Sequence, residues 1–157
     1  MSGSVSAGYD PLYPVPDNLP EPEIRTFISN FYRISDRPEA NALWVSQFTK
    51  DAHVAIGPGK ANGEEELRTM REGMWSVVRE RKHRVAKVFP GRFDESADGG
   101  NECELMLQGE VAYKTEDGQS STVAWAGHGI LRKVREEGGG SEEWKWKFAE
   151  YRVFMLK

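Results

Sequence analysis

The stretch TVAWAGHGILRKV, from Thr122 to Val134, decides the fold class of this chain. Its β-branched and aromatic residues, running without a helical period, are typical of a buried β-strand. Because successive strand residues face opposite sides, His128 and Trp125 are expected on different faces of the sheet. Gly127 and Gly129 flank the histidine and indicate a bulge or a sharp bend. Such a bend would aim His128 either into a cavity or against a backbone carbonyl.

Three further extended segments accompany this strand. They are HRVAKVFPGRF (83–93), CELMLQGEVAYK (103–114) and WKWKFAEYRVFML (144–156). The separators between the four segments are rich in Gly, Asp, Glu and Ser, which are turn residues. Short turns between long strands favour an antiparallel meander.

The preceding part of the chain has a helical period. Ile24, Phe27, Ile28 and Phe31 lie at i, i+3, i+4 and i+7 and form one apolar stripe. A second short helix is expected over residues 39–48, a short strand over 53–59, and a third helix from residue 62 to about 78. Helices gathered before a run of strands predict an α+β domain, mainly helical over 21–80 and mainly antiparallel strand over 82–156. The three helices would pack on one face of a curved mixed or antiparallel sheet.

The chain is expected to form one domain, residues 21–157, after a lead-in of residues 1–20. The lead-in is rich in Gly, Ser and Pro, which predicts a flexible or extended segment. Tyr9, Leu12 and Tyr13 leave open the alternative that it drapes over the domain.

Composition excludes several classes of function. The net charge is only −4 and the basic residues are scattered, so neither nucleic acid nor an anionic membrane is expected as a partner. A single cysteine, Cys103, rules out an intrachain disulfide, and the sequence has no metal-binding Cys/His cluster. No phosphate loop or nucleotide fingerprint is present, so we expect no metal and no cofactor. Without a signal peptide or a bilayer-spanning apolar run, the protein is expected to be soluble and cytoplasmic.

Several short motifs occur in a characteristic order. A helix ends in FYRISD (31–36), LWVSQFTKDAHV (43–54) follows, then a glycine and a helix, then a meander that closes with WKFAEYRV (146–153). In this order the chain resembles the nuclear transport factor 2-like superfamily, in its SnoaL-like and scytalone dehydratase-like branch, over residues 21–156. The resemblance implies a cone in which three helices close one side of a strongly bent sheet around a pocket. Such domains are cyclases, dehydratases and isomerases, and also non-catalytic binding or dimerisation modules.

The resemblance also implies a catalytic pair. His83, at the junction of the third helix and the sheet, resembles the histidine that acts as acid and base in scytalone dehydratase-like members. Asp36 resembles the acidic residue that orients it. A carboxylate fixes the tautomer of an imidazole and raises its basicity, so His83 could take or deliver a proton near neutral pH. His128 could serve as a second proton carrier in the same cavity.

Further side chains are candidates for binding a substrate. In the last strand, Glu150 and Arg152 are expected to share an inward face with Trp146 and Phe148. The aromatic candidates are Tyr32, Trp75, Tyr113 and Trp125.

Each candidate also has a purely structural interpretation. Asp36 could cap the second helix and His83 the end of the third. His128 could be a hydrogen-bonded structural histidine at a bulge. Glu150 and Arg152 could form a surface ion pair, and the four aromatic residues could belong to the core.

The chain departs from the dehydratase pattern at three positions. Ser35 and Ile56 stand where that pattern has tyrosines, and Gly109 or Glu110 stands where it has a second histidine. Dehydration of scytalone itself is therefore not expected.

The leading hypothesis is a cofactor-independent lyase, isomerase or cyclase acting on a small apolar metabolite of polyketide or terpenoid type. The alternative is a non-catalytic module of the same fold for ligand binding or dimerisation. Convergence of Asp36, His83 and His128 on one cavity would favour the enzyme. The resemblance further implies a homodimer formed through the outer face of the sheet.

Overall fold

The computed structural model of the chain describes residues 8–93, 100–136 and 143–156. Its helices are α1 (Glu23–Ser35), α2 (Asn41–Val45) and α3 (Glu64–Met74). Its strands are β1 (Phe48–Ile56), β2 (Gly59–Asn62), β3 (Val78–Gly91), β4 (Glu102–Thr115), β5 (Ser120–Glu136) and β6 (Glu143–Leu156). All six strands belong to one mixed sheet of order β2-β1-β6-β5-β4-β3, which is not closed into a barrel. The expected α+β class and the antiparallel meander of the four long strands are confirmed.

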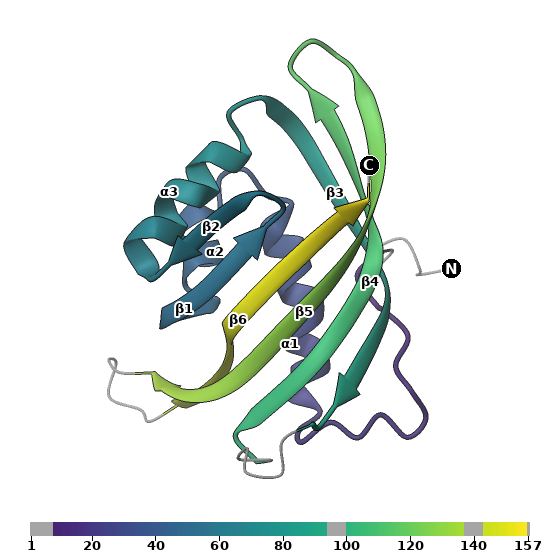
Figure 1. Cartoon of the computed structure of the whole chain (residues 1–157), viewed down its shortest axis with the longest axis vertical. Coiled ribbons are helices and arrows are strands. Elements are labelled where there is room, and N and C mark those ends of the chain that lie inside the picture. Colours follow the sequence, from purple (N-terminus) through teal and green to yellow (C-terminus); the bar gives the residue numbers. More distant parts are fainter. Residues whose placement is uncertain (1–7, 94–99, 137–142, 157) are drawn as a thin grey trace.

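One layer of helices covers one face of this sheet. Figure 1 looks onto the other face, with α1 behind the long strands and α2 and α3 beside β1 and β2. In the apolar stripe of α1, Ile24, Ile28 and Phe31 are buried and Phe27 is half-buried, as the helical period predicts. Phe31 packs edge-on against Phe148 of β6 at 4.9 Å between ring centroids. The core therefore lies between α1 and the concave face of the sheet.

The segment from residue 48 to residue 82 differs from its expected structure. Strand β1 begins at Phe48 and pairs in parallel with β6, which adds a parallel element to the sheet. Helix α3 ends at Met74, just after Gly73, and Val77 is exposed rather than buried. Glycine is a poor helix former, and pairing of Arg81 with Tyr113 of β4 extends β3 back to Val78. Tertiary pairing thus overrides the helical period here.

Strand β6 contains a bulge at Ala149. Ile130 of β5 pairs with Glu150 and the next residue, Leu131, pairs with Phe148, so Ala149 is an extra residue on the β6 side. An extra residue reverses the alternation of side chains beyond it. Phe148 and Tyr151 therefore both face the core.

The lead-in packs against the domain from Gly8 onward, and residues 1–7 lie outside the described part. The backbone of Gly8 accepts a hydrogen bond from Val85 N–H at 2.8 Å. Leu12 donates to the carbonyl of Ala86 and accepts from Val88, both at 2.9 Å. Residues 8–20 therefore do not extend away from the domain. They pack against it, along the free edge of β3.

We predict that replacing Gly109 of β4 with alanine destabilises the fold by at least about 2 kcal/mol, because overpacking forces the backbone to shift. A Cβ there would lie 2.1 Å from the carbonyl oxygen of Arg84 and 3.1 Å from the indole of Trp125. Gly73 in α3 is the matched control, since a Cβ there meets nothing within 4 Å. Gly73→Ala should stabilise by about 1 kcal/mol through helix propensity. Urea unfolding of both variants measures the two effects, and equal stability of Gly109→Ala and wild type would contradict the prediction.

Candidate active site

Asp36 occupies the first position after α1, and its carboxylate is 7% exposed. One oxygen, Oδ2, accepts hydrogen bonds from the Tyr9 hydroxyl at 2.6 Å and from the His83 backbone N–H at 2.8 Å. The other, Oδ1, lies 2.6 Å from His83 Nδ1. The carboxylate therefore joins the lead-in, the end of α1 and strand β3, and it does not cap α2.

His83 lies within β3, nine residues beyond the end of α3, and its side chain is 14% exposed. An ionised carboxylate can only accept hydrogen bonds, so the Asp36 contact places the neutral imidazole proton on Nδ1. Nε2, on the opposite side of the ring, keeps its lone pair. The contact between these two residues that the sequence led us to expect is present.

A cavity of about 170 Å³ lies between α1 and the concave face of the sheet. Most of the residues around it are apolar or aromatic, and the ionisable side chains among them are His83, Arg81 and two tyrosines. The lining residues are Phe31, Ser35, Trp44, Ile56, Met74, Arg81, His83, Val111, Tyr113, Trp125, Tyr151, Val153 and Met155. With Nδ1 held by Asp36, the imidazole offers Nε2 as a base to this cavity.

Two buried phenols lie at the cavity, Tyr151 in its wall and Tyr32 directly behind it. The hydroxyls of Tyr32 and Tyr151 are 2.8 Å apart. Burial raises the pKa of both tyrosines well above the ordinary value, so both stay protonated at neutral pH. Since one hydroxyl donates to the other, the pair retains one O–H that is free to donate.

Arg71 of α3 fixes the turn that carries Asp36. Its side chain is completely buried, and its guanidinium donates to the carbonyl oxygens of Ile34, Ser35 and Arg37 at 2.6–3.3 Å. It also donates to the side-chain oxygen of Asn41 at 2.9 Å. Burial lowers the pKa of Arg71 to about 10, which still leaves it charged at neutral pH. One side chain thus satisfies the carbonyls at the end of α1 and holds Asp36 in place.

The four aromatic candidates divide into two groups. Tyr113 and Trp125 line the cavity. Tyr32 stacks on Trp125 with ring centroids 5.4 Å apart and reaches the cavity through its hydrogen bond to Tyr151. Trp75 does not line the cavity but lies against the guanidinium of Arg81 at 4.8 Å.

The expectation that His128 lies in the same cavity as His83 is wrong. His128 lies on the outer face of the sheet, where its Nε2 is 2.7 Å from Oε2 of Glu104. The pairing of β5 with β4 and β6 is regular around Gly127 and Gly129, so strand alternation keeps His128 opposite the buried Trp125. The glycines instead make room for neighbours, because a Cβ at Gly129 would lie 2.6 Å from the Phe148 ring.

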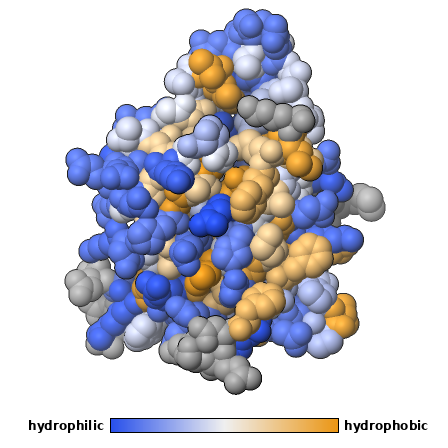
Figure 2. Space-filling view, viewed as in Figure 1, coloured by the Kyte–Doolittle hydropathy of each residue, from blue (hydrophilic) through white to orange (hydrophobic). Residues whose placement is uncertain are grey.

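Glu150 and Arg152 also lie on the outer face, and the expected inward position of this pair is wrong. Both are exposed, because the bulge at Ala149 turns them away from the side on which Phe148 lies. Figure 2 shows this outer face as a mixture of apolar and hydrophilic side chains.

Tyr151 and Arg81 are cavity residues that sequence reasoning missed. Sequence reasoning misses Tyr151 because plain alternation from Phe148, without the bulge, places it on the outer face of the sheet. It misses Arg81 because the helical period runs to Val78, so no strand is expected immediately after that residue. The spacing of two residues between Arg81 and His83 is the available signal, because two residues so spaced in a strand share a face.

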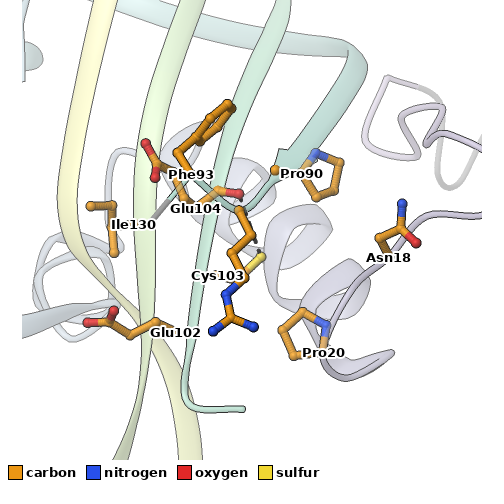
Figure 3. Close-up of a pocket in the computed structure, with 10 residues that line it drawn as sticks. Asn18, Pro20, Pro90, Phe93, Glu102, Cys103, Glu104 and Ile130 are labelled. Atoms are coloured by element: carbon orange, nitrogen blue, oxygen red, sulfur yellow. Dashed lines mark hydrogen bonds between the residues drawn. The ribbon is translucent and has the colours of Figure 1, made fainter. Parts of the chain in front are cut away.

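A larger hollow of about 420 Å³ lies where the lead-in meets β3, β4 and β5, with Cys103 among its lining residues (Figure 3). Burial raises the pKa of the Cys103 thiol to about 11, so the thiol is protonated and a poor nucleophile at neutral pH. Glu104 in this hollow already contacts His128, and Glu102 contacts Arg132. The hollow therefore offers no free base comparable to His83.

Within the part of the chain that the structure describes, no group of three His, Cys, Asp or Glu side chains is placed to hold a metal ion. In the same residues, no helix is both long enough and apolar enough to cross a lipid bilayer.

Comparison with solved structures identifies the class of fold. A protein of Novosphingobium aromaticivorans assigned as a scytalone dehydratase superposes with a TM-score of 0.70 at 13% identity, covering 85% of this chain and 82% of that one. A nuclear transport factor 2-like superfamily protein of Salmonella enterica serovar Typhimurium gives 0.66 at 13% identity, covering 84% and 87%. A type 2 hexachlorocyclohexane dehydrochlorinase (LinA) gives 0.61 at 16% identity, covering 85% and 86%. No family model and no curated protein matches the sequence.

The chain therefore has the nuclear transport factor 2-like fold. Structures described as a scytalone dehydratase and as a dehydrochlorinase share this fold with the chain.

We predict that Asp36→Asn reverses the tautomer of His83. The His83 backbone N–H can only donate, so the amide oxygen of Asn takes the Oδ2 position and its NH₂ group faces Nδ1. Nδ1 must then accept, and the proton moves to Nε2. Long-range ¹⁵N–¹H NMR correlations distinguish the two tautomers. His128, whose Nε2 contacts Glu104 on the other face, is an internal control that should not change. An unchanged His83 pattern would contradict the prediction.

Proposed function

We propose that this protein is a cofactor-independent lyase or isomerase in which His83 removes a proton from a small ring compound. The observation that carries the proposal is the Asp36–His83 pair, whose free Nε2 belongs to a small, mostly apolar cavity. A base must lie within hydrogen-bond reach of the proton that it removes, and a site with little water favours the step. The position of His83 among mostly apolar lining residues supports both requirements.

The chemical step transfers one proton and one electron pair. His83 Nε2 takes a proton from a carbon of the substrate, and the C–H electron pair forms a new double bond. In a lyase, a leaving group on the adjacent carbon departs with its own bonding pair. In an isomerase, the imidazolium returns the proton to a different atom. Asp36 stabilises the imidazolium in either case through the bond to Nδ1.

The cavity sets the size of the substrate. A cavity of about 150 Å³ holds a benzene molecule, so 170 Å³ suits one six-membered ring with small substituents. The phenol pair of Tyr32 and Tyr151 would donate to a carbonyl or leaving oxygen. A single-ring metabolite of polyketide or terpenoid type fits these dimensions.

The structural neighbours support this class of reaction. They include the proteins described above as a scytalone dehydratase and as a hexachlorocyclohexane dehydrochlorinase, and a ketosteroid isomerase-like protein of Erwinia carotovora. Each of these names denotes an elimination or a proton shift.

Proton abstraction can be tested before the natural substrate is known. Cyclohexanone, 2-cyclohexenone and 3-hydroxycyclohexanone are incubated with the protein in D₂O, and deuterium incorporation or elimination is followed by mass spectrometry. We expect turnover that falls at least about 100-fold in His83→Ala, the lower range for a lost acid–base group. His128→Ala is the matched control and should keep its rate within about twofold, since it removes an imidazole from the other face. Equal rates in His83→Ala and wild type would refute the role of His83. Ligand binding without any exchange would favour the non-catalytic module.

We also propose a homodimer that pairs the outer faces of two sheets. Phe89, Met106, Phe154 and Leu156 share this face and are 38–72% exposed. Acidic Glu104 and Glu150 lie among basic His53, His128 and Arg152 on the same face, so two copies related by a twofold axis can match opposite charges.

This interface predicts that the double variant Met106→Glu, Phe154→Glu is monomeric at micromolar concentration while wild type is dimeric. Val15, 99% exposed in the lead-in, is the matched site, and Val15→Glu should stay dimeric. Multi-angle light scattering measures the mass of each. A monomeric wild type would overturn the proposal.

A further inference from the structure

Four buried polar atoms of the described residues have no hydrogen-bond partner: Tyr13 Oη, Trp75 Nε1, Arg81 Nη1 and Trp125 Nε1. An unpaired buried donor is unfavourable and is rare in native proteins. Arg81 and Trp125 line the same cavity as His83. The unpaired atoms of these two residues, Arg81 Nη1 and Trp125 Nε1, are both N–H donors. A ligand that supplies a hydrogen-bond acceptor would therefore pair them.

Arg81 is held rigidly by its surroundings. Its guanidinium lies 4.8 Å from the ring of Trp75 and 5.3 Å from the ring of Tyr113. Nη2 donates to the Met74 carbonyl at 3.0 Å. The side-chain hydrogen bond of Tyr113 also stabilises the charged guanidinium. These contacts fix its plane, and Nη1 keeps no partner of its own, which is the arrangement of a preorganised donor.

The charge around Arg81 is not balanced locally. None of the residues that line the cavity is an Asp or Glu, and within the described chain Arg81 forms no ion pair with a carboxylate. Arg71 is a second buried guanidinium, and its hydrogen bonds go to neutral oxygens. Asp36 is the carboxylate whose charge acts on both. Glu39 is a further carboxylate and acts on Arg71 alone. The Arg81 guanidinium therefore has no acidic partner of its own, and a ligand with one negative charge would supply one.

We propose that the cavity binds a monoanionic ring compound whose charged oxygen, a carboxylate or a phenolate, accepts hydrogen bonds from Arg81 Nη1 and Trp125 Nε1. The inference rests on the proposed function for the reaction and adds the charge and orientation of its substrate. Arg81 also becomes the residue that selects for this charge.

The spacing of Arg81 and His83 suits such a ligand. The two residues are two apart in β3 and pair regularly with Tyr113 and Val111 of β4, so they share a face. Their Cα atoms are about 6–7 Å apart along the strand. A six-membered ring with its charged oxygen has a comparable length. An oxygen bound at Arg81 would therefore place the far side of the ring at His83.

Benzoate and its neutral isostere benzamide test the charge preference of the cavity. Quenching or enhancement of Trp fluorescence, checked by calorimetry, gives the affinity of each for the full-length protein. We expect benzoate to bind at least tenfold more tightly than benzamide. 4-Nitrophenol tests whether the site also binds a phenolate, because its absorption shifts when it ionises. A bound spectrum of the ionised form would show that phenolates bind as well as carboxylates.

Variants assign that preference to particular atoms. Arg81→Gln should reduce benzoate affinity at least tenfold and leave benzamide affinity unchanged, whereas Arg81→Lys, which keeps the charge, should retain part of the preference. Trp125→Phe removes one donor and keeps a ring, and should weaken benzoate binding several-fold. The matched control is Arg84→Gln, which removes the same charge from an exposed site of the same strand. It should bind as wild type.

The test separates this inference from the proposed function. His83→Ala should keep the preference for benzoate even though it loses proton abstraction, so the two can fail independently. Equal binding of benzoate and benzamide, no benzoate binding at millimolar concentration, or an unchanged preference in a folded Arg81→Gln variant would each overturn the anionic site.

Discussion

The arrangement of this site depends on the hydrogen bonds that the carboxylate of Asp36 accepts. The carboxylate accepts a hydrogen bond from the lead-in through Tyr9 and two from His83 of β3, and it extends from the residue that ends α1. Burial and the neighbouring carboxylate both raise the pKa of Tyr9, so its hydroxyl stays protonated and keeps donating. Three segments that are distant in the sequence thus meet at one charged group. Charge-assisted hydrogen bonds of this kind are about twice as strong as neutral ones.

The position of that carboxylate depends in turn on Arg71. A buried guanidinium that binds only neutral oxygens fixes the backbone on both sides of Asp36 without pairing with the carboxylate itself. The negative charge of Asp36 therefore remains available to His83. Had Arg71 formed a salt bridge with Asp36, the same two charges would have neutralised each other and left the imidazole less polarised. The separation of the two roles, Arg71 for the backbone and Asp36 for the histidine, is what makes the pair suited to proton transfer.

The fold class could be anticipated from strong periodicities in the sequence, and the Asp36–His83 pair from the family resemblance that the order of short motifs carries. The helical stripe of α1 and the four extended segments were enough to give the α+β class and the meander. The other assignments failed where a single residue changes the face of a strand. The glycines beside His128 indicate a bend that would aim it into a cavity or against a backbone carbonyl, yet these glycines make room for Phe148 and Trp125. Glu150 and Arg152 were given to the cavity because nothing in the sequence AEYR marks Ala149 as an extra residue. Arg71, in the middle of a charged helix, carries no signal of its burial, because its partners are backbone carbonyls contributed by another helix.

The bulge at Ala149 has a consequence for how this domain can change over evolution. The register of β6 beyond the bulge, and not its composition alone, decides which of its residues form the interior. Loss of Ala149 would remove the bulge and restore plain alternation, so Glu150 and Arg152 would stay outside and Tyr151 and Val153 inside. A one-residue slip that pairs Ala149 would instead exchange the two faces of the strand beyond it. Point substitutions can adjust the cavity gradually, whereas such a slip would replace its wall in a single step, and chains that share this fold but pair this strand in the other register should have very different pockets.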